Sequence, residues 1–147
     1  MLDVASLVVR LRGRKVYFDT NIFIYVLNNT PDVAQPCLAL LQACEDRQLI
    51  GLTGDVTLAE LLVKPLQAND AAAVAAVREL LIEDGAIGLL GHDRAAFEKA
   101  AALRAQYGLK MVDALHLATA QLAGAACLIS NDLRLPSLSG LECLSLA

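Results

Sequence analysis

The sequence predicts an α/β fold in which a mostly parallel sheet is covered by helices on both faces. Short apolar runs alternate along the chain with segments whose apolar residues recur at helical spacing. Strands that alternate with helices are typical of parallel sheets, because each crossover between parallel strands needs room for a helix. The chain has 147 residues, the usual size of one domain, and shows no repeat or low-complexity tract. We therefore expect a single domain, 1–147.

The first half of the chain opens with a segment, 1–14, that we expect to form a short helix as an N-terminal extension. A short apolar run predicts a buried strand at 16–18. Helical spacing of apolar residues predicts helices at 22–28, with Thr20 or Asn21 as N-cap, and at 33–47. A second apolar run predicts a strand at 49–53.

The middle of the chain continues the alternation. A short helix is expected at 58–63, stopped by Pro65, because proline disfavours helix in the residue before it. An alanine-rich segment predicts a helix at 69–83, and an apolar run predicts a strand at 86–90. The next helix, 93–107, is expected to end at a glycine, the residue most common just beyond a helix C-terminus.

The last part of the chain predicts a helix at 112–123, followed by a glycine, and strands at 127–130 and 141–146. The loop between these strands runs through a proline. In parallel α/β folds ligands gather at the carboxyl ends of the strands. Polar residues that directly follow a predicted strand are therefore the first candidates for a functional site.

Composition narrows the function classes. Hydrophobic residues make up 56% and charged residues 19%, which excludes wholesale disorder. No apolar stretch is long enough to span a membrane, and the positive charges near the N-terminus follow an aspartate, the wrong order for a secretory signal. We expect a cytoplasmic location. The four cysteines form no CxxC pair and there are only two histidines, so we expect buried apolar cysteines and no zinc site.

Four carboxylates stand in apolar or junction contexts, and each also has a simpler structural explanation. Asp19 follows the first strand, where an Asx-turn is common. Glu60 lies three residues after Thr57, the spacing of a capping box. Asp113 suits the first turn of a helix, where the helix dipole favours acids. Asp132, after the strand 127–130, is ordinary turn composition.

Taken together, the four carboxylates favour a metal site. Asp19 and Asp132 follow predicted strands, and Glu60 and Asp113 lie in helices that would abut the same edge of the sheet. Converging carboxylates repel and raise one another's pKa values, a cost that a divalent cation removes. Mg²⁺ or Mn²⁺ prefers oxygen ligands and binds substrate phosphates. Acids without histidine or cysteine thus indicate metal-dependent phosphate chemistry.

The order of four short segments resembles the PIN domain, and within it the VapC-type toxins of bacterial toxin–antitoxin pairs. These segments are an apolar strand followed by DTN and an apolar helix, then TLAELLVKPL, then DALHLATA, then SND. The resemblance runs from about Val16 to Leu146. It implies a three-layer α/β/α sandwich and a metal-dependent endoribonuclease that cleaves RNA with water activated on Mg²⁺ or Mn²⁺.

The resemblance also assigns roles by position. Asp19 and Asp113 match the principal metal ligands, while Glu60 and Asp132 complete the catalytic acids. Asn21 and Ser130 match polar positions beside the metal, as further supporting residues. Products with a 5′-phosphate and a 3′-hydroxyl, a homodimer and a cognate antitoxin over the active site are also implied.

The rest of the sequence bears on substrate contacts. His116 shares a helix face with Asp113, either as a structural histidine or as a residue that orients a ligand. Arg134 and Lys110 are the best candidates for phosphate contacts, because both lie close in sequence to proposed ligands. The formal net charge of −4 counts against nucleic acid. That charge is balanced, however, if the four carboxylates hold divalent cations.

Three other functions remain open. A phosphotransfer receiver domain expects an acidic pair after the first strand, whereas Asp19 is followed by Thr20 and Asn21, and only Asp55 stands where an acceptor would be. A PIN-like nuclease that processes RNA without a toxin role is the second alternative. The third is a non-catalytic PIN-like binding domain, which the presence of all four acids argues against.

Overall fold

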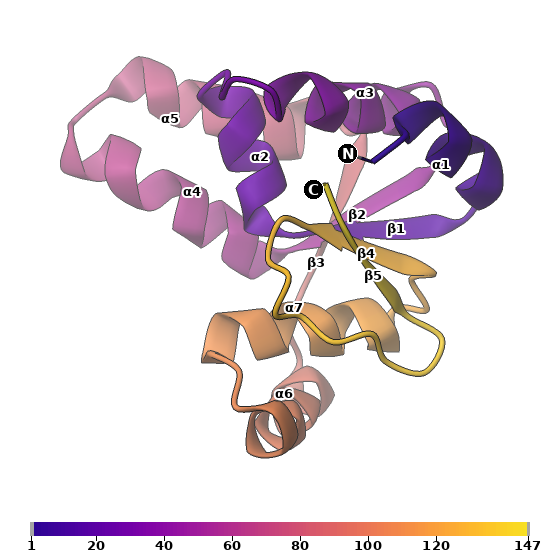
Figure 1. Ribbon diagram of the computed structural model, residues 1–147. Helices are drawn as coiled ribbons and strands as arrows, with labels where there is room; N and C mark the ends of the chain where they lie inside the picture. Colours follow the sequence, from indigo (N-terminus) through magenta and orange to yellow (C-terminus); the bar gives the residue numbers. More distant parts are fainter. Residues whose placement is uncertain (1, 147) are drawn as a thin grey trace.

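The structure, a computed structural model, describes residues 2–146 (Figure 1). Five strands and seven α-helices make up the described part of the chain. The strands are β1 (Lys15–Phe18), β2 (Ile50–Gly54), β3 (Ile87–Leu90), β4 (Cys127–Ser130) and β5 (Glu142–Ser145). The helices are α1 (Val4–Leu11), α2 (Thr20–Leu27), α3 (Ala34–Glu45), α4 (Asp55–Gln67), α5 (Ala71–Arg78), α6 (Arg94–Tyr107) and α7 (Met111–Leu122).

The five strands form one sheet in the order β3-β2-β1-β4-β5, and all four pairings are parallel. The predicted mostly parallel sheet is therefore confirmed, and the described sheet has no antiparallel strand. β1 lies at the centre, with β2 and β4 on either side. Successive strands are added on one side of β1 as far as β3, after which the chain crosses to the other side for β4. The topological switch point thus falls between β1 and β4.

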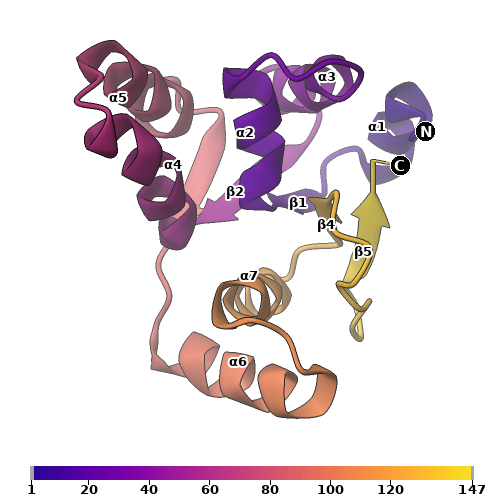
Figure 2. The same cartoon turned by 60° about the vertical axis from the view of Figure 1, so that its left-hand side comes forward.

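Helices cover both faces of the sheet, as the sandwich architecture requires (Figures 1 and 2). Helices α1 to α5 pack on one face and share a core with Val16 and Phe18 of β1. Helices α6 and α7 pack on the other face, where the core includes Tyr17 of β1. Alternate residues of β1 therefore enter different cores, the period-2 pattern of a strand buried on both sides.

Side-chain caps explain where several helices begin. The carboxylates of Asp3, Asp70 and Asp93 each accept a hydrogen bond from a backbone N–H in the first turn of the helix that follows. The helix expected within residues 1–14 is α1. Helix α6 ends at Gly108, whose φ of 69° is the left-handed conformation that glycine adopts most readily.

Helix α4 differs most from the sequence-based expectation. It begins at Asp55 and continues through Pro65 to Gln67, whereas the prediction covered 58–63 only. Pro65 lies in the last turns, where it removes one backbone donor, while the amide of Ala68 still bonds to the carbonyl of Lys64. The helix expected at 69–83 is also modified, because α5 passes into a π-helical turn at Glu79–Glu83. The other predicted boundaries are off by a few residues at most.

The cysteines are mostly core residues. Cys37, Cys44 and Cys127 are buried as predicted, whereas Cys143 is only half-buried, and all four are free thiols. Burial raises the pKa of Cys37 to about 11 and that of Cys44 to about 12. These thiols are therefore protonated and unreactive at neutral pH. Within residues 2–146, no helix has the length and apolar character needed to cross a membrane.

Candidate active site

Asp19 directly follows β1 at the switch point and is 7% exposed. Its backbone N–H donates to the carbonyl of Ile129 on β4. One carboxylate oxygen, Oδ1, accepts from the backbone N–H of Thr20 at 2.7 Å, and the other, Oδ2, accepts from the Ser130 hydroxyl at 2.6 Å. Asp19 is therefore the N-cap of α2, although its bond goes to the next residue rather than two residues on, as the predicted Asx-turn would require. This capping role does not exclude a functional role, because the same carboxylate faces the site.

Glu60 reaches the site from α4. The Thr20 hydroxyl donates to its Oε1 at 2.6 Å. The capping-box explanation is wrong, because Thr57 lies inside α4 rather than before it. The Thr57 hydroxyl is instead fully buried, 2.8 Å from that of Thr53 and 3.1 Å from that of Thr20. Burial opposes ionisation of Glu60, yet interactions with His116 and Thr20 outweigh it, and its pKa is lowered from the ordinary value.

His116 of α7 lies behind these two acids and is 1% exposed. Its Nε2 is 3.6 Å from Asp19 Oδ1 and 3.5 Å from Glu60 Oε1. The same nitrogen is 3.1 Å from the Thr20 hydroxyl, and Nδ1 is 2.7 Å from the hydroxyl of Tyr17. The histidine predicted to share a face with Asp113 is thus a buried partner of the acids.

Asp113, in the first turn of α7, is half-buried. Its pKa is raised from the ordinary value, first by burial and then by the negative charges of Asp19 and Asp132. This is the mutual effect expected of converging carboxylates. The described hydrogen bonds include none from Asp113 to the other acids, so charge is what couples it to them.

Asp132 follows β4, and Arg134 binds it in a bidentate ion pair with distances of 2.9 and 2.7 Å. Hydrogen bonds from Arg134 hold the pKa of Asp132 below its ordinary value, and the charge of Lys110 adds to the effect. Arg134 and Lys110, the two residues predicted to contact phosphate, thus both lie near Asp132. Their contact with phosphate stays a prediction.

Asn21 and Ser130, the two supporting residues predicted from the resemblance, are joined to each other. Asn21 Nδ2 donates to the Ser130 hydroxyl at 3.3 Å, and the backbone N–H of Asp132 donates to the same oxygen at 3.0 Å. Ser130 in turn donates to Asp19, so it ties the ends of β1 and β4 together. The buried Oδ1 of Asn21 has no hydrogen-bond partner among the described residues.

Sequence reasoning missed the buried hydroxyls under the acids. Tyr17, Thr53 and Thr57 were expected as strand core or as a helix cap, and Thr20 as purely structural. The Thr53 hydroxyl donates to the carbonyl of Phe18 at 2.8 Å. One signal was available in the sequence: two threonines four residues apart flank the end of the second predicted strand, and a third follows Asp19 directly.

The donor set fits Mg²⁺ or Mn²⁺ in kind, because it consists of carboxylate, amide and hydroxyl oxygens. The raised pKa of Asp113 and the unsatisfied Asn21 oxygen are both features that a bound cation would relieve. However, these acidic side chains do not surround one common point, as the ligands of a coordination sphere would. Among residues 2–146, no set of three or more histidine, cysteine, aspartate or glutamate side chains is grouped closely enough to hold a metal ion.

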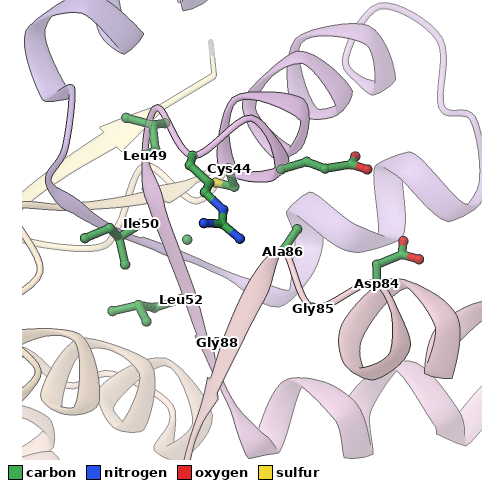
Figure 3. Close-up of a pocket in the computed structure, with 11 residues that line it drawn as sticks. Cys44, Leu49, Ile50, Leu52, Asp84, Gly85, Ala86 and Gly88 are labelled. Atoms are coloured by element: carbon green, nitrogen blue, oxygen red, sulfur yellow. The ribbon is translucent and has the colours of Figure 1, made fainter.

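Apart from these acids, the surface has a hollow of about 460 Å³ at the amino ends of β2 and β3 (Figure 3). The ladder between these strands begins at the pair Gly51 and Ile87, so the residues before it splay apart. Cys44 lies beneath the hollow, and a Cβ on Gly51 would lie 2.7 Å from its sulfur. None of the predicted site residues lines this hollow, which leaves the switch point as the candidate site.

The fold and the site define a three-layer α/β domain with acidic side chains gathered at the switch point of an all-parallel sheet. The sequence matches the PIN domain family over residues 16–141. Because the match spans most of the chain, this protein belongs to the PIN domain family.

Solved structures with similar folds come from toxin–antitoxin systems. A toxin–antitoxin complex from Klebsiella pneumoniae includes a chain that is 26% identical, with a TM-score of 0.61 over 86% of this chain and 94% of that chain. VapBC2 from Rickettsia felis, bound to a promoter DNA fragment, matches with a TM-score of 0.68 at 17% identity, over 89% and 98% of the two chains. VapC20 from Mycobacterium tuberculosis, a sarcin–ricin loop cleaving toxin, has a TM-score of 0.62 at 13% identity, over 77% and 86%. A search of curated proteins found no match.

Proposed function

We propose that this protein is an Mg²⁺- or Mn²⁺-dependent endoribonuclease and the toxin of a type II toxin–antitoxin pair in the cytoplasm. The observation that carries the proposal is the convergence of acids at the switch point. Asp19 and Glu60 share the partners Thr20 and His116, and the charges of Asp19 and Asp132 raise the pKa of Asp113. A bound divalent cation would offset the mutual repulsion of these carboxylates.

Asp19, Asp113, Asp132 and Glu60 would hold the metal. A bound ion of this kind polarises the phosphodiester and lowers the pKa of an attacking water. The chain's own residues supply the rest. Asp19 is fixed by Ser130 and by the backbone of Thr20, so its orientation is set before substrate arrives. The ionised form of Glu60, favoured by its lowered pKa, is available to accept a proton from water.

Arg134 is placed to contact a phosphate of the RNA. Asp132 uses two of its donors, and the rest of the guanidinium faces solvent, with the side chain 69% exposed. Lys110 adds a second positive charge near the same carboxylate. Attack by water on phosphorus, with the 3′ oxygen as the leaving group that takes up a proton, would leave a 5′-phosphate and a 3′-hydroxyl.

An apolar groove beside the acids supports an antitoxin partner. Its volume is about 510 Å³, it lies between α2, α4 and α5, and Glu60 is among the residues that line it. Ile24 and Val63, which also line it, are 39% and 51% exposed. A peptide segment seated here would cover apolar surface together with Glu60. We propose a homodimer as well, and monomers alone in light scattering at micromolar concentration would contradict it.

The enzymatic proposal is tested with purified protein, structured RNA and either Mn²⁺ or Mg²⁺. Wild-type protein should cleave the RNA, and EDTA should abolish cleavage. Asp19→Asn should lower the rate roughly a thousandfold, because it removes several kcal/mol of metal-dependent stabilisation. Asp46→Asn, an exposed aspartate that bonds to Gln42 on α3, is the matched control and should cleave normally.

Equal cleavage by wild type and Asp19→Asn would mean that another site or a contaminant is responsible. The toxin role is tested separately, by expression in cells with and without the product of a neighbouring small open reading frame. Growth arrest that the neighbour relieves supports a toxin. Arrest-free expression of an active nuclease would favour an RNA-processing role instead.

A further inference from the structure

The only two histidines of the chain both have polar partners on each ring nitrogen, and these partners fix the ring tautomers. For His92, the backbone N–H of Val56 lies 3.2 Å from Nε2 and can only donate. The Nε2 atom therefore carries the lone pair, and Nδ1–H donates to the Thr119 hydroxyl at 2.7 Å.

For His116, the partners require the opposite tautomer. The hydroxyl of Tyr17 lies 2.7 Å from Nδ1 and carries a proton that it can donate to this nitrogen. Nδ1 is thus the acceptor of the His116 ring.

The other nitrogen of His116 faces only oxygens that accept. Thr20 gives its own hydroxyl proton to Glu60, so its oxygen is free to accept from Nε2 at 3.1 Å. The carboxylate oxygens of Asp19 and Glu60 lie 3.6 and 3.5 Å from the same nitrogen. A lone pair on Nε2 would be repelled by all of them, so Nε2 carries the hydrogen.

We propose that His116 is a positioning residue: oriented by Tyr17 at Nδ1, it uses Nε2–H to hold Thr20 and the Glu60 carboxylate in place. The proposal rests on the nuclease function proposed above. It joins four elements, because Tyr17 lies on β1, Thr20 on α2, Glu60 on α4 and His116 on α7. The Glu60 side chain is 38% exposed, so its orientation depends on these inner contacts rather than on packing.

The tautomers are tested first, in wild-type protein without metal or RNA. Long-range ¹H–¹⁵N correlation spectra at neutral pH should show a proton on Nε2 in His116 and on Nδ1 in His92. Because the chain has only two histidines, His92→Gln assigns both signals. A proton on Nδ1 of His116 would overturn the proposal, whether or not the protein proves to be a nuclease.

The positioning role is tested with a matched pair of amides at residue 116. The side-chain amide of His116→Gln reaches the place of Nε2 and keeps a donor there, whereas that of His116→Asn is too short. We expect His116→Asn to lower kcat about 10–100-fold with little change in KM, and to weaken Mn²⁺ binding measured by EPR. His116→Gln should retain most of the wild-type kcat and most of the Mn²⁺ affinity. We expect the two variants to lose similar thermal stability.

Tyr17→Phe provides a second route, since it removes the donor to Nδ1 and leaves the residue-116 side chain intact. It should allow the Nδ1–H tautomer of His116 to appear and lower kcat less than His116→Asn does. Wild-type kcat in folded His116→Asn and in Tyr17→Phe would refute the positioning role. If wild-type protein itself cleaves no RNA, the nuclease proposal fails instead, and the Mn²⁺ affinities of the two amide variants still decide the role of His116.

Discussion

The two halves of the candidate site are held in place by different means. The inner half, Asp19, Thr20, Glu60 and His116, is connected by hydrogen bonds, and all of its members except the exposed Glu60 are buried. The outer half, Asp113, Asp132 and Arg134, is half-buried or exposed. Its members are linked by charge and by one ion pair at the surface.

This difference separates what is preorganised from what can rearrange. Asp19, Thr20 and His116 are fixed because their polar groups would be costly to leave unpaired in the interior, and Glu60 is bonded to Thr20. The outer half has no such constraint, and solvent screens its ion pair. We infer that a cation entering the site would find Asp19 and Glu60 in place, and that Asp113 and Asp132 would adjust to it. This accounts for four acids that converge without forming a coordination sphere.

The largest effect is expected from Asp113→Asn in the outer half. Cleavage should fall roughly a thousandfold, as for Asp19→Asn, because a proposed metal ligand is lost. In EDTA at pH 7, however, the variant should be more stable than wild type, by less than about 1 kcal/mol. Denaturant unfolding measures this difference.

The sign of that stability change follows from the raised pKa of Asp113. A carboxyl group whose pKa is higher in the folded than in the unfolded state destabilises the fold once pH exceeds the unfolded value. The advantage of Asp113→Asn should therefore shrink as pH falls toward the ordinary pKa of aspartate. If Asp113→Asn is less stable than wild type at pH 7, the charges of Asp19 and Asp132 do not destabilise ionised Asp113 as inferred.

The next effect concerns the support of the inner half. A Cβ on Gly54 would lie 2.6 Å from the Tyr17 hydroxyl and 2.3 Å from the His92 ring. Gly54→Ala should cost about 1–3 kcal/mol in the free energy of unfolding, because both rings must shift. Gly91→Ala is the matched control, since its Cβ would meet only Asp55 at 3.9 Å. Equal stability of the two variants would show that the rings move aside easily.

A smaller loss is expected from Thr57→Val, which removes a fully buried hydroxyl and nearly preserves the shape of the side chain. Thr53 and Thr20 would each lose a partner, at a cost of about 1–2 kcal/mol. Thr30→Val, at a partly exposed threonine, should change stability much less. Thermal unfolding of both variants tests whether the inner half depends on its hydroxyl network.

The smallest stability effect is expected from Arg134→Ala. Its ion pair with Asp132 is exposed, so the free energy of unfolding should change by less than about 1 kcal/mol. RNA binding should weaken, and the slope of log affinity against log salt should fall by about one for the lost phosphate contact. Arg10→Ala, which breaks an equally exposed pair with Glu142, should leave binding unchanged.

The sequence was enough to predict the elements, because they depend on local pattern, and to single out four acids that the structure places near one another. Apolar runs and helical spacing indicated every strand and helix, and residues after strands indicated Asp19 and Asp132. The end of α4 was missed because a proline near a helix C-terminus costs little. The contact of Tyr17 with His116 was not predicted for another reason. A tyrosine in an apolar strand is expected to be a core residue, and only the fold brings His116 next to it.

The position of Asp19 at the start of α2 has a practical consequence. Asparagine caps a helix about as well as aspartate does, so Asp19→Asn should keep the bond to the backbone of Thr20 while losing the charge that the proposed cleavage needs. The substituted protein is therefore a suitable bait for capturing an uncut RNA from a cell extract and identifying it by sequencing.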